Sequence, residues 1–300
     1  MRVRVLGSAA GGGFPQWNCG CPNCRGLREG RLAAEPRTQE SIAVSADGAR
    51  WVLLNCSPDV ARQIEAFPPL RPRRLRDTPI AAIVLTNGDL DHCLGLLVLR
   101  EAQRLVVYAT AAVRDAFLEN PFARTLERFP GQVEWRAPSP GVESPLADTG
   151  LRITAVPAPG KPPLHREGRA EPVAEDNVGL LIRDPAGASL AYFPGVARLT
   201  DAVARVLADA DCVFFDGTFW AGDEMGALGI GGRPAEAMGH LPVGGPAGSL
   251  AALASLRAPR RVYIHVNNTN PMLREDGPEH AAVLAADWEV ASDGLDLTLG

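Results

Sequence analysis

The stretch IAAIVLTNGDLDHCLGLLVLR, residues 80–100, decides how the rest of the chain is interpreted. Its opening run, Ile80–Leu85, is rich in Ile, Val and Leu, which is typical of a buried strand. Asn87-Gly88 then indicates a turn, and an apolar helix-like run follows from Leu94. Acidic residues and a histidine lie between the turn and this run. Because α/β folds place functional groups where a buried strand gives way to a helix, the stretch predicts an α/β fold with a site at this strand end.

Asp91 and His92 supply a hard oxygen and a borderline nitrogen, a pair that suits a divalent metal. An isolated pair of this kind is also explained by a capping aspartate followed by a surface histidine. However, the apolar run Cys212–Phe215 ends at Asp216, and Arg261–His265 ends on its histidine. These strand ends together predict one mononuclear site with two histidines and two carboxylates. Such a site resembles the 2-His-1-carboxylate group of non-haem Fe(II) with one extra carboxylate, although zinc or manganese also fits.

Two further residues are candidates for catalysis. His240 follows Gly239 in a glycine-rich stretch and is a candidate for substrate contact or proton transfer, or else a packing or loop histidine. Asp89 either orients His92 from outside the ligand set or is simply solvated. The segment Pro157–Glu175 is too polar to pack well and is expected to form a mobile flap over a site.

Cysteines are clustered near the N-terminus as Cys19-x-Cys21-x-x-Cys24 in a turn-rich segment. Three thiolates on one short loop can hold one face of a tetrahedral zinc ion, and the fourth ligand must come from elsewhere. Zinc would give this loop an order that its own small core cannot supply. Free thiols or a redox pair are the alternatives, and a redox pair is less favoured because no βαβ context surrounds the motif. A structural zinc is therefore predicted.

Composition excludes some classes of function. The chain has 300 residues, 46% of them hydrophobic and 22% charged, which is enough for a large core. Its formal net charge of −5 does not favour binding to nucleic acids. The sequence offers neither the apolar run of a signal peptide nor one long enough for a membrane span. We therefore expect a cytoplasmic protein without a membrane segment.

Strand patterns dominate both halves of the chain. Two hairpins are predicted, one from residues 41–44 and 51–55 around Asp47-Gly48 and one from residues 178–182 and 189–193. Ser57 is expected to cap a helix that has Pro58 in its first position. Further helices are predicted at residues 111–118, 200–208, 248–256 and 278–286. This order of elements indicates two sheets packed face to face with helices outside.

This layout resembles the metallo-β-lactamase fold, a four-layer αββα sandwich. In that family a Thr-His-x-His-x-Asp-His motif follows a core strand, and the corresponding residues here are Thr86–His92. Asn87 and Asp89 stand where the family has two histidines, whereas the final Asp-His pair is retained. Asp216 and His265 match the later aspartate and the last histidine of the family. The resemblance implies one domain over residues 1–300 that has lost the three-histidine metal site and kept the other.

A closer resemblance covers nearly the whole chain. GSAAGGGFPQWNCGCPNC, PRTQESIAVS, FFDGTFW, MGH and HVNNTNP resemble the pyrroloquinoline quinone (PQQ) biosynthesis protein B family. The resemblance implies an Fe(II)- and O₂-dependent hydroxylation of the tyrosine-derived ring in a cross-linked Glu-Tyr precursor. It also implies that the protein acts together with other proteins of PQQ biosynthesis. A carrier that moves PQQ or its precursor towards the periplasm and a metal-dependent hydrolase are the alternative functions.

The resemblance leaves the fourth ligand of the cysteine cluster open. In some relatives the residue three positions beyond the last active-site histidine takes this role, and here that residue is Asn268, a poor zinc ligand. A nearby aspartate, water or His265 itself are the alternatives. If His265 served the zinc, the proposed iron site would lose a ligand.

Overall fold

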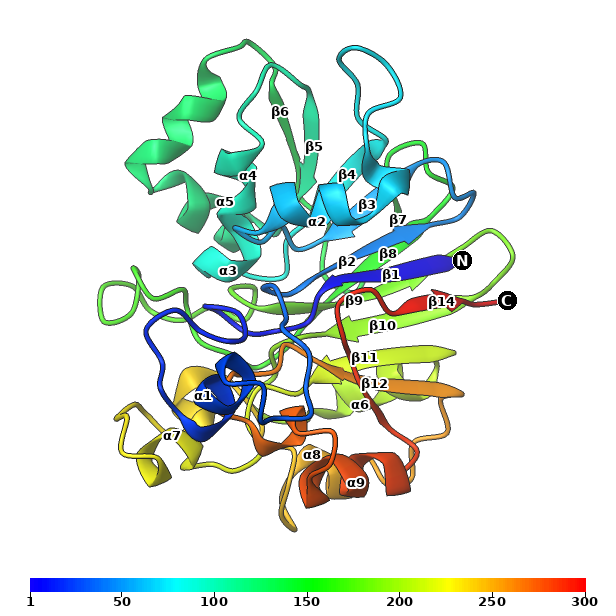
Figure 1. Ribbon diagram of the computed structural model, residues 1–300. Coiled ribbons are helices and arrows are strands. Elements are labelled where there is room, and N and C mark those ends of the chain that lie inside the picture. The colour runs from blue at the N-terminus through cyan, green and yellow to red at the C-terminus, as the bar shows by residue number, and fades with distance from the viewer.

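Two seven-stranded β-sheets pack face to face in the computed structural model, which describes residues 1–300 (Figure 1). From edge to edge, the first sheet contains β14 (Asp296–Thr298), β1 (Arg2–Gly7), β2 (Ser41–Ser45), β3 (Trp51–Leu54), β4 (Ile80–Val84), β5 (Leu105–Tyr108) and β6 (Val133–Arg136). The second contains β13 (Glu289–Val290), β12 (Arg260–Ile264), β11 (Cys212–Asp216), β10 (Ser189–Phe193), β9 (Val178–Arg183), β8 (Arg152–Pro157) and β7 (Ser144–Pro145).

The main core lies between the sheets. Alternate residues of each strand point inwards, so Val44 and Leu54 of the first sheet share one buried cluster with Leu180, Phe214 and Ile264 of the second. The opposite faces of both sheets are also apolar and must be covered. This requirement explains why the buried strands carry near-continuous hydrophobic runs.

Helices cover both outer faces and complete four layers, as predicted (Figure 1). The first sheet is covered by α2 (Val60–Ala66), α4 (Gly95–Val98) and α5 (Ala111–Leu118), and the second by α6 (Asp201–Ala208), α8 (Ser249–Ala252) and α9 (Pro278–Ala285). The remaining helices are α1 (Pro22–Arg28), α3 (Leu90–Cys93), α7 (Glu224–Ala227) and four short 3₁₀ helices, η1 (Pro68–Leu70), η2 (Pro121–Glu127), η3 (Ala235–Met238) and η4 (Pro271–Leu273). Across all the helices of the structure, no candidate for a membrane span is found.

Both predicted hairpins are confirmed. Strands β2 and β3 pair antiparallel with Ile42 opposite Leu54, and β9 and β10 pair antiparallel with Ile182 opposite Leu190. The helix expected at residues 248–256 is shorter, because α8 ends at Ala252.

The apolar helix-like run expected from Leu94 is confirmed by α4, which begins at Gly95 with Leu94 before it. A separate short helix, α3, precedes it and carries Asp91 and His92, because the N–H groups of His92 and Cys93 bond to the carbonyl of Asp89. One predicted helix start was wrong. The helix expected after Ser57 begins at Val60 with Asp59 before it, because the Ser57 hydroxyl bonds to Gln63 instead of capping the helix.

Candidate metal centre

The predicted ligands meet at one edge of the sandwich, where the strands that precede them end. Helix α3, which follows β4, carries Asp91 and His92, and His265 comes directly after β12. Parallel pairing of β11 with β12 places Asp216 beside Ile264, so that it ends at the same edge as His265. The two sheets are linked here by the bond from the Val178 N–H to the carbonyl of Thr86.

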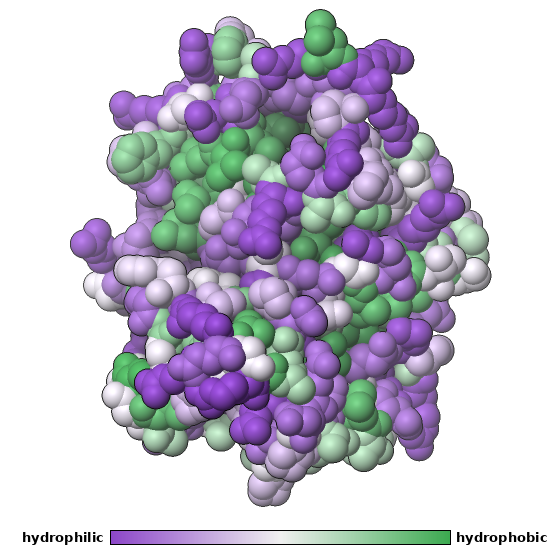
Figure 2. All heavy atoms as spheres, in the orientation of Figure 1, coloured by the Kyte–Doolittle hydropathy of each residue, from purple (hydrophilic) through white to green (hydrophobic).

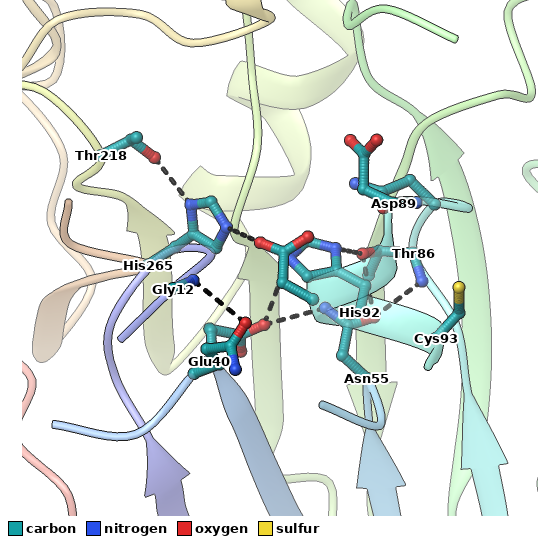
Figure 3. Close-up of polar contacts among 12 residues, drawn as sticks. Gly12, Glu40, Asn55, Thr86, Asp89, His92, Cys93, Thr218 and His265 are labelled. Atoms are coloured by element: carbon teal, nitrogen blue, oxygen red, sulfur yellow. Dashed lines mark hydrogen bonds and ion pairs between the residues drawn. The ribbon is translucent and has the colours of Figure 1, made fainter. Parts of the chain in front are cut away.

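Asp91, His92 and His265 form the first of two adjoining clusters. Asp91 Oδ2 lies 3.2 Å from His265 Nε2 and 4.0 Å from His92 Nε2. The two imidazole rings are 5.0 Å apart between centroids and nearly perpendicular (Figure 3). Two nitrogens and one oxygen therefore converge on one small space, as a 2-His-1-carboxylate metal site requires.

The charge states of this cluster suit a cation. Burial lowers the pKa of His92 to about 3, so its ring is neutral. Burial acts to raise the pKa of Asp91, but the hydrogen bond and charge of His265 outweigh it and hold that pKa below its usual range. His92 Nε2 is buried and has no hydrogen-bond partner. Because buried polar atoms are nearly always satisfied, an unpaired nitrogen beside a carboxylate indicates a place for a metal ion.

His265 is oriented by a threonine and a carboxylate. Thr218 Oγ1 lies 2.7 Å from Asp216 Oδ1 and 2.7 Å from His265 Nδ1. An ionised carboxylate only accepts hydrogen bonds, so the hydroxyl proton of Thr218 goes to Asp216, and Thr218 in turn accepts from His265 Nδ1–H. Nε2 of His265 then faces Asp91 Oδ2 at 3.2 Å, which is the orientation of a metal ligand.

Asp216, His240 and His265 form the second cluster, which shares His265 with the first. Asp216 Oδ2 accepts hydrogen bonds from the Val196 N–H and from His240 Nδ1, each at 2.8 Å. Burial opposes ionisation of Asp216, but His240 and His265 lower its pKa. The ring of His240 stacks on that of His265 with 5.3 Å between centroids, and it is partly exposed. The structure therefore brings His240 and all four predicted ligands into one region.

Asp89 does not orient His92. Its carboxylate accepts hydrogen bonds from Lys161 Nζ at 3.1 and 3.2 Å, and the residue that contacts His92 Nδ1 is Thr86. Burial raises the pKa of Asp89, and Lys161 opposes that shift. Lys161 belongs to the predicted flap and ties it to the start of α3. It is the only lysine in the chain, a signal that sequence reasoning missed.

The three cysteines near the N-terminus lie together in the structure. The sulfur atoms of Cys19, Cys21 and Cys24 lie within 4.8 Å of one another. A hydrogen bond from Cys24 lowers the pKa of Cys21 to about 5, so this thiol readily becomes a thiolate ligand. The side-chain amide of Asn268 lies 3.1, 3.6 and 3.3 Å from the three sulfur atoms. Asn268 thus occupies the fourth side, whereas His265 points into the other centre.

Sequence reasoning also missed Glu40, Asn55 and Thr86, which surround His92 (Figure 3). Glu40 is fully buried, and its Oε2 lies 3.7 Å from His92 Nε2. Burial raises the pKa of Glu40 to about 7. A single glutamate ahead of a strand carries no pattern that would single it out.

A large cavity lies elsewhere. It has a volume of about 770 Å³ and is lined by residues that include Ile64, Ile80, Leu105 and Phe129. Ile80 and Leu105 begin β4 and β5, so the cavity lies at the opposite strand ends from the metal centre. Figure 2 shows a broad apolar area on the side of the molecule where helices cover the first sheet. None of the predicted ligands lines this cavity.

Comparison with known proteins identifies relatives over the full length. Residues 50–266 match the family described as "Beta-lactamase superfamily domain". The chain is 46% identical to "Coenzyme PQQ synthesis protein B" of Azotobacter vinelandii, with all of both chains covered, and 48% identical to that of Cupriavidus necator, with 99% of each covered.

Solved structures resemble the chain over its full length as well. The crystal structure of Zn²⁺-bound PqqB from Methylobacterium extorquens matches with a TM-score of 0.93 and 43% identity, and both chains are covered completely. A diphosphatase of the PhnP family matches with a TM-score of 0.70 and 22% identity over 100% of this chain and 98% of the other, a likeness that shows only the shared fold.

Proposed function

Since the chain belongs to the coenzyme PQQ synthesis protein B family and has the metallo-β-lactamase fold, we propose that it is an Fe(II)- and O₂-dependent hydroxylase of PQQ biosynthesis. Its substrate would be the cross-linked Glu-Tyr precursor supplied by other proteins of the pathway, and the tyrosine-derived ring would be hydroxylated. The observation that supports this best is the convergence of Asp91, His92 and His265 with an unpaired His92 Nε2.

The proposed iron ligands are Asp91, His92 and His265, with Asp216 as the fourth from its place beside His265. Ferrous iron would supply the redox chemistry that O₂ activation needs, although zinc or manganese also fits these ligands. Asn87 and Asp89 replace two histidines of the related fold, so the three-histidine site used in dinuclear hydrolysis is missing. This loss favours a mononuclear reaction over hydrolysis. The three cysteines would hold a separate structural zinc, with Asn268 facing it.

His240 is the proposed proton-transfer residue. Its Nδ1–H is held by Asp216, so Nε2 is the atom that remains to exchange a proton with a ring oxygen of the substrate. Its partial exposure keeps it within reach of a bound substrate. Asp89 and Lys161 form a charged pair at the rim, where they would orient the charged groups of an amino-acid substrate.

The test is a single-turnover assay. The protein is loaded with Fe(II) without oxygen, mixed with the cross-linked precursor and a reductant, and exposed to ¹⁸O₂. One oxygen atom should enter the ring while the other leaves as water, which consumes two electrons from the reductant and two protons. Mass spectrometry should therefore find one ¹⁸O in the product, and the His92→Ala variant should give none. Tight precursor binding without any product would instead support a carrier.

A further inference from the structure

A buried chain of polar side chains leads from the second sheet to His92. Tyr192, on β10, donates its hydroxyl proton to Glu40, and Asn55 Nδ2 donates to Glu40 at 2.9 Å. Asn55 Oδ1 in turn accepts from both the N–H and the hydroxyl of Thr86, each at 3.0 Å. Thr86 Oγ1 lies 3.2 Å from His92 Nδ1. Each of these side chains is buried.

The hydrogen bonds of this chain favour one direction. The N–H of Thr86 can only donate, so the Asn55 atom that faces it must be the carbonyl oxygen, and the amide nitrogen must face Glu40. The Thr86 hydroxyl lies 3.0 Å from that oxygen and 3.2 Å from His92 Nδ1, and the shorter contact favours donation to Asn55. Thr86 Oγ1 then accepts from His92, which places the proton of His92 on Nδ1.

We infer that Asn55 and Thr86, held in place by Glu40, fix the tautomer of His92 so that its Nε2 presents a lone pair to the metal. Asn55 has a left-handed backbone with φ of 61°, and its amide bonds to both Glu40 and Thr86. Thr218 and Asp216 hold His265 in the same way, so both histidines are set before any metal arrives. Asn55, Thr86 and Glu40 are therefore positioning residues. The inference rests on the proposed metal centre and not on the proposed hydroxylation.

The tautomer can be tested in the wild-type protein. The chain has only five histidines, so long-range ¹H–¹⁵N spectra of metal-free, ¹⁵N-histidine-labelled protein are simple to interpret. The His92→Ala variant identifies the signals of His92. We expect a neutral ring protonated on Nδ1. A ring protonated on Nε2 would overturn the inference, whatever the enzyme's activity.

Two variants test the consequence for metal binding. Thr86→Val keeps the shape of the side chain but removes the acceptor, and Thr86→Ser keeps the hydroxyl as the matched control. With the cysteine cluster filled by Zn²⁺, Co²⁺ affinity at the centre is measured by competition with a chromophoric chelator. Thr86→Val should lower this affinity about 10- to 100-fold and Thr86→Ser should largely restore it. Equal affinity in wild type and Thr86→Val would overturn the inference. No Co²⁺ binding in wild type would refute the proposed centre, and the spectra would still test the tautomer.

Discussion

Gly95→Ala should damage the metal centre through the packing of α4, the helix that adjoins the metal-binding helix α3. Gly95 is the first residue of α4 and lies against the Cys56–Ser57 turn, where its N–H donates to the carbonyl of Cys56 at 2.9 Å. The N–H of Cys56 in turn donates to the carbonyl of His92 at 2.7 Å. A Cβ on residue 95 would lie only 2.6 Å from Cys56 O and Sγ and would also overlap with Ser57 O, whereas real Cβ contacts essentially never fall below 3.0 Å.

The loss of folding free energy in the Gly95→Ala variant follows from this overlap. The colliding atoms are mostly backbone, so α4 and the adjoining α3 must move away from the turn, and overpacking of this kind costs about 1–3 kcal/mol. With an unfolding entropy of about 2.1 cal/mol/K per residue, a chain of this length loses about 2–5 °C in Tm. Because the same shift moves His92, the affinity of the centre for a metal should fall about tenfold or more.

Differential scanning calorimetry and metal titration measure both effects. Gly222→Ala is the matched control, because the nearest atom to its added Cβ is 3.9 Å away. We expect the control to keep wild-type Tm and metal affinity. If Gly95→Ala were as stable as wild type and bound metal equally well, the contact between α4 and the turn would not position the site.

Further predictions concern the two metal sites and the loop beside them. By elemental analysis, His92→Ala should lose the metal of the centre and keep the cysteine-bound zinc, whereas Cys21→Ser should lose the zinc and lower the Tm. Metal affinity of the centre should fall as the pH falls through the pKa of His265, which its bond to Asp91 raises against the effect of burial. Below that pKa the cation must displace one proton from His265, so the logarithm of the metal association constant should fall by about one for each unit that the pH is lowered. A metal affinity that does not change with pH would contradict this. Lys161→Met should speed proteolysis within residues 158–177, whereas Lys161→Arg should not, because only Met removes the ion pair to Asp89.

Much of the fold follows from local patterns in the sequence. Alternating and continuous apolar runs place the hairpins, and residues with ligand chemistry at the ends of buried strands point to the metal centre. Helix α3 was not predicted, because it is a single turn that contains Asp91 and His92, polar residues that precede the apolar run of α4.

The surroundings of the ligands could not be predicted, because they depend on contacts between distant segments. Asn55 and Thr86 are 31 residues apart, and Glu40 meets Tyr192 across 152 residues of sequence. Asn268 was considered only as a poor ligand, yet the fold places its amide over all three cysteines. The lone lysine, in contrast, was visible in the composition, since Lys161 is one lysine among 30 basic residues.

The central claim is that Asp91, His92 and His265 hold one cation. X-ray diffraction from iron-loaded crystals, recorded on both sides of the iron absorption edge, tests it most directly. The account predicts one iron peak at about 2.0–2.2 Å from His92 Nε2, His265 Nε2 and an Asp91 oxygen. Metal found only at the cysteine cluster, or an iron peak that His92 does not contact, would contradict it.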